Sequence, residues 1–358
     1  MKPEIIKKRV RAIRRTLNKK KITSLLLTKP ANVTYTTGFL GEDSWALITD
    51  RGLWLLTDSR YTEQAQKQCP YSKIIERTGP IAQAAGQLVK KLKSIKTVTV
   101  ENSASLAAFE ALKKNLRTRI KTSENIIEEL RSIKDQSEIA AIKKAAQIAA
   151  DALKKTMRRI KPGITENELA GTLDFQVRKL AAVNSFPTIV AFGPNASLPH
   201  YQPASKKLKK NDTILIDFGV RYKGYCSDIT RCFTVGRPTA FYKKLYNVAE
   251  QAQAAALKMI KAGIEIKKVD AAARSVIAEY DLPVYGHGTG HGLGLQVHEA
   301  PTLAANIKGT LKAGNIVTIE PGVYIPSKAG VRIEDDILVT KSGYKILSSS
   351  CPHRLLPD

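Results

Sequence analysis

The sequence predicts two domains that both combine helices with strands: an α/β domain over residues 1–128 and a larger α+β domain over residues 129–358. Three observations lead to this fold class. A chain of 358 residues is longer than one hydrophobic core usually supports. Its 43% hydrophobic and 25% charged residues are the proportions of an ordinary globular protein. Short strand-like segments alternate with helical ones, and a long helical pattern begins after a break between residues 125 and 135.

The first domain begins with a basic amphipathic segment that includes residues 10–17. Short apolar segments bounded by turn residues then predict strands, and longer periodic segments predict helices. The expected strands cover residues 22–28, 45–49, 53–57 and 97–100, and the expected helices start at Thr62 and Ile81. Together these elements form an α/β domain with its own core.

The second domain opens with a long helix that starts near Asp135. Asp135 and Glu138 have the spacing of a capping box, and Thr165 and Glu168 repeat this spacing before the next helix. Apolar residues three or four positions apart predict helices over residues 139–160, 243–262 and 267–280. We find no internal repeat and no low-complexity segment in the sequence.

The balance of 58 basic against 32 acidic residues gives a net charge of +26, which invites a nucleic-acid interpretation. The lysines are nevertheless spread along the chain, with short runs only at 19–21 and 206–210. No zinc finger, helix-turn-helix or aromatic RNA-binding signature accompanies them. We therefore interpret the charge as a lysine-rich solvated surface, for which nucleic-acid binding is at most non-specific and salt-sensitive.

The N-terminal residues 1–15 are charged, with no apolar segment typical of a secretory signal. No apolar run approaches the roughly 20 residues that span a bilayer. We therefore expect a cytoplasmic protein with no membrane partner. Its four cysteines, Cys69, Cys226, Cys232 and Cys351, show no CxxC spacing and are expected to be reduced. Cys226 and Cys232 fit packing residues of a hairpin better than a disulfide or redox pair.

Histidines gather in one segment of the second domain. Four of the five lie between positions 200 and 298, and three share the stretch from His287 through His291 to His298, with four glycines between them. These glycines allow the backbone to approach a ligand or a metal closely. By itself, the stretch also fits a glycine-rich turn whose histidines are structural.

Four carboxylates change that balance, because each lies at the end of an apolar strand or inside one. Asp217 ends the segment Thr-Ile-Leu-Ile-Asp, and Asp228 follows on the expected partner strand of a hairpin. Glu320 ends the segment Ile-Val-Thr-Ile-Glu, and Glu334 lies within residues 331–338. Buried carboxylates are costly unless they are paired or bind a metal. One such residue fits a capped turn or a salt bridge, whereas four beside a glycine-flanked histidine indicate a metal site.

Two aspartates, two glutamates and one histidine provide enough ligands for two divalent ions with bridging carboxylates. An oxygen-rich ligand set favours Mn²⁺, Co²⁺ or Fe²⁺, and Zn²⁺ stays open as an alternative. Two ions about 3.5–4 Å apart can lower the pKa of a water molecule and polarise a peptide carbonyl. Metal-assisted amide hydrolysis is therefore the expected reaction class. No serine nucleophile motif and no phosphate-binding loop of the form GxxxxGK(S/T) competes with it.

The motifs around these residues resemble those of the Xaa-Pro aminopeptidase/prolidase family, metallopeptidases with the pita-bread fold. In the second domain the similar segments are 216–219, 227–231, 287–298, 319–324 and 332–335. In the first domain the segments 32–35, 37–39 and 57–61 resemble the N-terminal domain that this family shares with creatinase. The resemblance covers nearly the whole chain. It implies a creatinase-like N-terminal α/β domain and a C-terminal α+β pita-bread catalytic domain.

The resemblance also implies a set of metal ligands. The implied ligands are Asp217, Asp228, His291, Glu320 and Glu334, with Asp228 and Glu334 bridging two divalent ions per subunit. Mn²⁺ is the preferred ion, and Co²⁺, Zn²⁺ and Fe²⁺ are alternatives. Glu320 would also act as the general base or proton shuttle for the attacking water.

Further residues match positions around the metals. His200 and His298 match catalytic histidines that contact the substrate and stabilise the tetrahedral intermediate. The residues matched to substrate binding are His287, Tyr324 and Arg332, of which Tyr324 and Arg332 steady the ligands and the substrate. Phe192 stands where many relatives have a small residue, at the expected pocket wall.

The resemblance implies a homodimer that acts on peptides with proline at the second position. Within the family, we favour an Xaa-Pro aminopeptidase over an Xaa-Pro dipeptidase, or prolidase. Prolidase-type relatives often carry an arginine just after the His-Glu-x-Pro sequence, where it can hold the free carboxylate of a dipeptide. Here Thr302 follows His298-Glu-Ala-Pro301 and cannot supply that charge.

Three other interpretations fit less well. Methionine aminopeptidases resemble the site but usually lack the N-terminal domain. Creatinase shares both domains but does not use this metal set. A non-catalytic pita-bread protein that binds protein or nucleic acid typically loses ligands, whereas all five are present here.

Overall fold

The structure is a computed structural model and describes residues 3–352. The chain separates into two compact units, Met1–Arg131 and Ser132–Asp358. This division lies close to the boundary predicted at 128/129.

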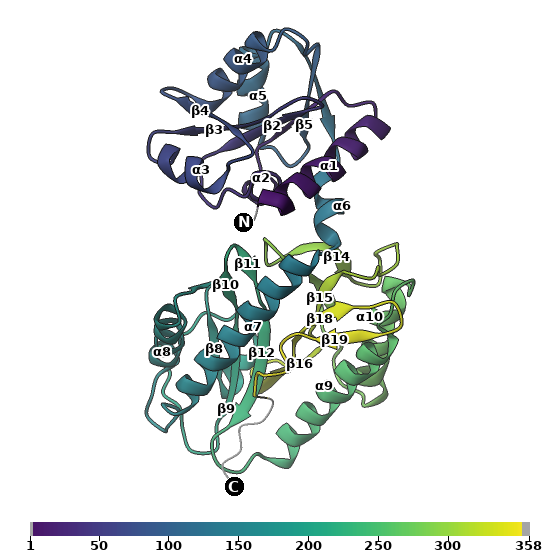
Figure 1. The fold of residues 1–358 in the computed structure, drawn as a ribbon. Coiled ribbons are helices and arrows are strands. Elements are labelled where there is room, and N and C mark those ends of the chain that lie inside the picture. Colours follow the sequence, from purple (N-terminus) through teal and green to yellow (C-terminus); the bar gives the residue numbers. More distant parts are fainter. Residues whose placement is uncertain (1–2, 353–358) are drawn as a thin grey trace. The chain divides into compact units, whose positions relative to one another are not determined.

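The first unit is an α/β domain built on one six-stranded sheet (Figure 1). Its helices are α1 (Pro3–Lys19), α2 (Pro30–Thr37), α3 (Thr62–Gln68), α4 (Ile81–Lys91), α5 (Leu106–Asn115) and α6 (Ile126–Ser132). Its strands are β1 (Ser24–Leu27), β2 (Trp45–Thr49), β3 (Leu53–Asp58), β4 (Lys73–Arg77), β5 (Thr97–Glu101) and β6 (Arg119–Ser123), in the sheet order β4-β3-β2-β1-β5-β6. Only β2 runs antiparallel to its neighbours; the other pairs of this sheet are parallel.

The predicted elements of this unit form where apolar residues repeat. α1 buries Ile6, Val10, Ile13 and Leu17, which are three or four positions apart and therefore share one helix face. The strands β1, β2, β3 and β5 lie close to their predicted limits. The sequence analysis did not predict α2, because this helix is buried from Ala31 to Thr37 on every side and shows no one-sided apolar stripe.

The second unit combines four helices with short sheets. Its helices are α7 (Gln136–Met157), α8 (Glu166–Lys179), α9 (Ala240–Met259) and α10 (Ile266–Glu279), with a short 3₁₀ helix η1 (Gly193–Ser197). Its strands are β7 (Val183–Asn184), β8 (Ile189–Phe192), β9 (Thr213–Phe218), β10 (Val220–Tyr222), β11 (Tyr225–Cys226), β12 (Ile229–Thr234), β13 (Gly290–Gly292), β14 (Glu299–Leu303), β15 (Ile316–Ile319), β16 (Gly322–Ile325), β17 (Ala329–Arg332), β18 (Asp335–Val339) and β19 (Tyr344–Ile346). The two sheets that carry the site have the orders β12-β9-β8 and β14-β13-β15-β18-β19.

Both predicted capping boxes are confirmed. Asp135 caps α7 and Thr165 caps α8, and in each case the glutamate three residues later accepts a hydrogen bond from the backbone of the capping residue. α7 and α8 pack with β8, β9 and β12 around one core. α9 and α10 pack with β15 to β18 around another.

These two helix pairs share a turn that was not noted from the sequence. The segments Ile160-Lys161-Pro-Gly163-Ile164 and Ile260-Lys261-Ala-Gly263-Ile264 lie 100 positions apart and make the same turn. Gly163 has a φ of 97° and donates to Leu208 O at 2.8 Å; Gly263 has a φ of 87° and donates to Leu311 O at 2.8 Å. Each turn leads into a helix of 14 residues, α8 or α10. The second unit therefore has two halves, one with α7 and α8 and one with α9 and α10, that share this turn and the helix after it.

Two further observations concern the whole of the described chain. All four cysteines are buried and unpaired, which agrees with the expected reduced thiols. Within residues 3–352, no helix combines the length and the apolar character needed to cross a membrane.

Candidate metal centre

Two of the predicted ligands come from the β9–β12 pair of the first half. These strands are antiparallel, and Thr230 of β12 lies opposite Asp217 of β9. Asp228 immediately precedes β12 and is 5% exposed. Its backbone N–H donates to Asp336, which fixes the chain just before the strand. The apolar residues of β9 face the core, so the pairing of these two strands brings both carboxylates to one place.

The other three predicted ligands come from the second half. His291 is the central residue of β13, Glu320 follows β15, and Glu334 lies between β17 and β18. The glycines on each side of His291 are required by close strand contacts. A Cβ atom on Gly290 would lie 1.9 Å from Thr318 O, and one on Gly292 would lie 2.3 Å from Ala300 O. The glycine spacing is thus explained by close approach of neighbouring strands, rather than by the approach to a ligand or metal that the sequence suggested.

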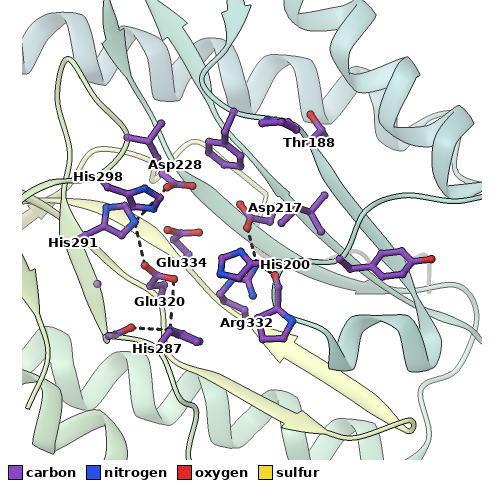
Figure 2. Close-up of a pocket in the computed structure, with 18 of the residues that line it drawn as sticks. Thr188, His200, Asp217, Asp228, His287, His291, His298, Glu320, Arg332 and Glu334 are labelled. Carbon is purple, nitrogen blue, oxygen red and sulfur yellow. Dashed lines mark hydrogen bonds and ion pairs between the residues drawn. The ribbon is translucent and has the colours of Figure 1, made fainter. Parts of the chain in front are cut away.

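The structure brings all five predicted ligands into one cavity of about 590 Å³ (Figure 2). The ligand atoms of Asp228, His291 and Glu334 lie within 4.8 Å of one another. His291 Nε2 is 3.5 Å from Asp228 Oδ2 and 3.3 Å from Glu320 Oε1. In Figure 2 the five side chains point toward a common centre.

The hydrogen bonds of His291 indicate which of its ring nitrogens faces the carboxylates. Its Nδ1 lies 3.1 Å from Gly292 O, so Nδ1 carries the proton and Nε2 presents a lone pair to the carboxylates. Burial lowers the pKa of His291, which favours the neutral ring. A lone pair that faces two carboxylate oxygens is repulsive unless a cation or a proton lies between them. The donor set therefore fits a bound cation.

Asp217 adds a second indication. Its Oδ2 accepts a hydrogen bond of 2.6 Å from Arg332 Nη2. Its Oδ1 is buried and has no hydrogen-bond partner among residues 3–352. A buried carboxylate oxygen without a partner is costly. Coordination of a divalent ion at this oxygen would remove the cost.

The electrostatics of the cluster agree with this interpretation. Burial and then repulsion from Glu334 raise the pKa of Asp228, and burial and then repulsion from Glu320 raise the pKa of Glu334. Burial likewise raises the pKa of Glu320 to about 7, with further repulsion from Asp217. Carboxylates held this close resist full ionisation on their own. Two divalent ions would offset the accumulated negative charge and keep them ionised.

His200 and His298, the histidines expected to contact the substrate, lie on the cavity wall. His200 follows η1, and His298 immediately precedes β14. The His298 ring packs edge-on against the His291 ring, with centroids 4.3 Å apart. His287 also lines the cavity, and burial lowers its pKa to about 4.

His287, Tyr324 and Arg332 form a hydrogen-bonded chain. His287 Nδ1 bonds to Gly288 O, so its Nε2 accepts from the Tyr324 hydroxyl at 3.1 Å. That hydroxyl in turn accepts from Arg332 Nη1 at 2.7 Å. Arg332 and His287 line the cavity, whereas Tyr324 lies behind them and does not reach its surface. Tyr324 is therefore connected to the site through its hydrogen bonds with His287 and Arg332.

One predicted wall residue is misplaced. Phe192 is fully buried in the core with α7 and α8, and it does not line the cavity. The wall is formed instead by residues that the sequence analysis did not single out, which include Phe186, Thr188, Ile189, Tyr201 and Gln202. Apart from Ile189, which begins β8, these residues lie in irregular segments without periodic pattern, so no sequence signal identified them.

Glu166, a buried glutamate that was not predicted from the sequence, positions part of this cavity wall. It is fully buried in the first turn of α8. Its Oε1 accepts from Phe192 N at 2.8 Å and Asn195 Nδ2 at 2.9 Å. Its Oε2 accepts from the Tyr201 hydroxyl at 2.8 Å and Ala204 N at 3.2 Å. Glu166 therefore fastens both ends of the loop that carries His200.

Known proteins resemble this chain over both units. Residues 140–341 match the model of metallopeptidase family M24, and residues 9–133 match that of the creatinase/prolidase N-terminal domain. An Xaa-Pro dipeptidase of Pyrococcus horikoshii is 34% identical over 353 residues, which cover 97% of this chain and 98% of the relative. An uncharacterised peptidase of Bacillus subtilis is 40% identical over 335 residues, with coverage of 92% and 94%.

Solved structures of related peptidases are also similar to nearly the whole chain. An Xaa-Pro dipeptidase from Bacillus anthracis has a TM-score of 0.92 at 37% identity and covers 98% of this chain and 99% of that chain. An X-Pro aminopeptidase from Thermotoga maritima has a TM-score of 0.88 at 34% identity, with coverage of 95% and 100%.

The fold and the site together define a two-domain metal-dependent peptidase. The chain belongs to metallopeptidase family M24 and carries the creatinase/prolidase domain before the catalytic one. The predicted family, the creatinase-like first domain and the pita-bread fold of the second are confirmed.

Proposed function

We propose that the protein is an Xaa-Pro dipeptidase that uses two divalent ions. The observation that carries the proposal is the convergence of four carboxylates and a neutral imidazole, whose Nε2 lone pair faces oxygens at 3.3 and 3.5 Å. The choice of substrate rests on the relatives named Xaa-Pro dipeptidase, which are 37% and 34% identical over nearly the full chain.

The ions would be held by Asp217, Asp228, His291, Glu320 and Glu334. When bound, two such ions lower the pKa of a water molecule toward neutrality and polarise the scissile carbonyl. The oxygen-rich ligand set supports Mn²⁺ first, then Co²⁺ and Fe²⁺, with Zn²⁺ as a further candidate.

The chain's own residues supply proton transfer and orientation. Glu320 lies in the ligand cluster, where its carboxylate can take a proton from a water molecule and return it within one reaction cycle. His298 and His200 lie on the wall, where each can donate a hydrogen bond to an oxygen that develops negative charge. The chain from Arg332 through Tyr324 to His287 keeps the His287 ring in one orientation.

An Xaa-Pro aminopeptidase is the second candidate, and one observation favours it. A dipeptidase must hold the free carboxylate of its substrate, and a basic side chain suits this task. Arg332 is the one lysine or arginine among the described residues of the cavity. Its nitrogens already donate to Asp217, Thr230 and Tyr324. This supports the preference for longer peptides that the sequence analysis expressed, and the Thermotoga maritima relative bears the aminopeptidase name.

The test compares kcat/KM for Ala-Pro with kcat/KM for Ala-Pro-Ala at one saturating metal concentration. We expect a preference of about tenfold or more for Ala-Pro. A preference for the tripeptide would assign the aminopeptidase activity instead. If the enzyme cleaves Ala-Ala but neither Ala-Pro nor Ala-Pro-Ala, proline specificity is refuted. Homodimer formation and a cytoplasmic location remain predictions, to be tested by light scattering and by cell fractionation.

A further inference from the structure

A cavity of about 330 Å³ lies wholly within the first unit, and its charge is opposite to that of the metal site. Three segments that are distant in sequence contribute cations to it. These are α1, the turn between β2 and β3, and the segment that begins β4 (Figure 1). The cations are Lys7, Arg11, Arg14, Arg51 and Lys73, and no acidic residue lines the cavity. We call this cavity the basic pocket.

The basic pocket is a formed cavity rather than a flat charged surface. Val10 and Leu53 are 6% and 5% exposed and give it an apolar floor. The half-buried Tyr71 adds one wall, and Lys7 Nζ lies over its ring at 4.9 Å from the centroid. Arg14 Nε donates to Thr49 O at 2.8 Å, which fixes the guanidinium at the cavity. Burial and hydrogen bonding thus hold part of the cationic lining in place.

The acidic residues near the basic pocket compensate little of its positive charge. Lys7 lies 3.7 Å from Glu4, whose side chain is 80% exposed. Arg51 lies 3.4 Å from Asp50, and both side chains are largely exposed. Ion pairs this exposed contribute little. Arg11 and Lys73 form no ion pair with any residue between 3 and 352. Like charges therefore face one another across the pocket with little compensation.

The charge of the first unit strengthens the effect. Residues 1–131 contain 26 basic and 12 acidic residues, so the field around the pocket is positive beyond its own lining. Such a field attracts anions and raises their local concentration. Three of the five cations are arginines, whose planar guanidinium groups bind phosphate oxygens in pairs.

We propose that the basic pocket is a binding site for a small oligophosphate, a short chain of phosphate groups either free or carried by a small molecule. The cavity is large enough for several phosphate groups, and its cations surround it from three sides. The proposal is independent of the peptidase reaction, because it uses no residue of the metal site. It accounts for a concentration of charge that the proposed function leaves unexplained.

Titration of the full-length protein with tripolyphosphate at constant ionic strength tests the proposal. The test variant is Arg11→Glu with Lys73→Glu, two exposed residues without ion pairs. The matched control is Lys114→Glu with Lys121→Glu, two exposed lysines of the same unit that do not line the pocket. We expect saturable binding of one equivalent, weakened about tenfold or more in the test variant and less than about twofold in the control. Tripolyphosphate also chelates metal ions, but this affects all variants alike, and calorimetry on metal-free protein provides a parallel reading.

Three results would overturn the proposal. Equal weakening in both variants would mean diffuse attraction of polyanions. Equal binding of citrate would mean a general anion site rather than one for phosphate. Binding of a single-stranded RNA through the pocket, without competition from tripolyphosphate, would assign a nucleic acid instead.

Discussion

At the scale of single residues, Glu320 links the two functions of the proposed site. It lies 3.3 Å from the Nε2 of His291, so it belongs to the ligand cluster. Its Oε1 also accepts from the Thr318 hydroxyl at 3.1 Å, which orients the carboxylate. A carboxylate in this position can also accept a proton from a water molecule and release it again.

Glu320→Gln is therefore expected to lower kcat by about 10²-fold or more, because the amide keeps a ligand oxygen but cannot carry the proton. Steady-state kinetics on Ala-Pro, with metal content measured on the same sample, checks this. Glu279→Gln, an exposed glutamate at the end of α10, is the matched control. A Glu320 variant that keeps more than half of the wild-type rate at unchanged metal content would contradict the role.

Glu166→Gln tests the loop that carries His200. The amide nitrogen cannot accept the hydrogen bonds that one carboxylate oxygen now accepts, so the loop loses part of its attachment. We expect kcat/KM to fall about ten- to a hundredfold, because a small displacement of a positioning group is costly. Amide hydrogen exchange within residues 193–206 should become faster.

The matched control for Glu166 lies two residues away. Glu168 belongs to the capping box of the same helix, and its carboxylate accepts hydrogen bonds from Thr165. Glu168→Gln should cost about 1 kcal/mol of stability or less and leave the kinetics unchanged. Tyr201→Phe, which removes the hydroxyl that donates to Glu166 and accepts from Asn195, should act in the same direction as Glu166→Gln but more weakly. Identical kinetics for wild type and Glu166→Gln, in an active enzyme, would refute the positioning role.

At the scale of elements, strands were predicted better than the loops between them. Apolar segments placed Asp217 and Glu320 at strand ends, and both lie where β9 and β15 position them. Glu166 escaped prediction because its partners are 26 to 38 residues away, in a loop that periodicity does not describe. Phe192 was misjudged because a family comparison at one position does not show which face of β8 the side chain occupies. The pairing of strands that are distant in sequence determines which face such a side chain occupies. That pairing cannot be read from a single sequence.

The pair β3–β4 gives a prediction at this scale. Asp58 at the end of β3 lies opposite Arg77 of β4, and their side chains are 3.0 Å apart. The hydrogen bond from Arg60 lowers the pKa of Asp58 to about 2. A depressed pKa means that the interaction stabilises the fold above pH 3.8 and is lost as the pH falls through 2.

We therefore expect Asp58→Asn to lower the thermal midpoint at pH 7, and this difference to shrink as the pH falls from 4 toward 2. Calorimetry across that range measures it. Asp50→Asn, in a largely exposed pair with Arg51, should have no effect at any pH. A difference that does not change with pH would show that Asp58 acts through shape rather than charge.

At the scale of the whole molecule, the stability of the catalytic unit depends on how the negative charge of its four clustered carboxylates is compensated. Four carboxylates are held together by contacts that join the two halves. Arg231 of β12 pairs with Asp335 of β18 at 2.6 Å, and Thr230 donates to Glu334 at 2.6 Å. Without cations, the carboxylates repel one another across this junction.

Metal removal should therefore affect stability as well as activity. A chelator is expected to abolish Ala-Pro hydrolysis and to lower the thermal midpoint. Free metal at a hundredfold excess over its Kd should restore about 2.7 kcal/mol for each independent site. Activity and calorimetry after addition of Mn²⁺, Co²⁺, Fe²⁺ or Zn²⁺, with metal content determined per chain, check both expectations. Full activity in a verified metal-free sample would refute the proposed mechanism.

The two halves of the second unit contribute different ligands to the proposed site. Asp217 and Asp228 belong to the half with α7 and α8, whereas His291, Glu320 and Glu334 belong to the half with α9 and α10. Neither half alone holds a complete ligand set, so the ions would link the two halves. We therefore expect metal affinity to depend on how closely the two halves pack. A substitution in either core, far from every ligand, would then weaken metal binding by shifting one half against the other.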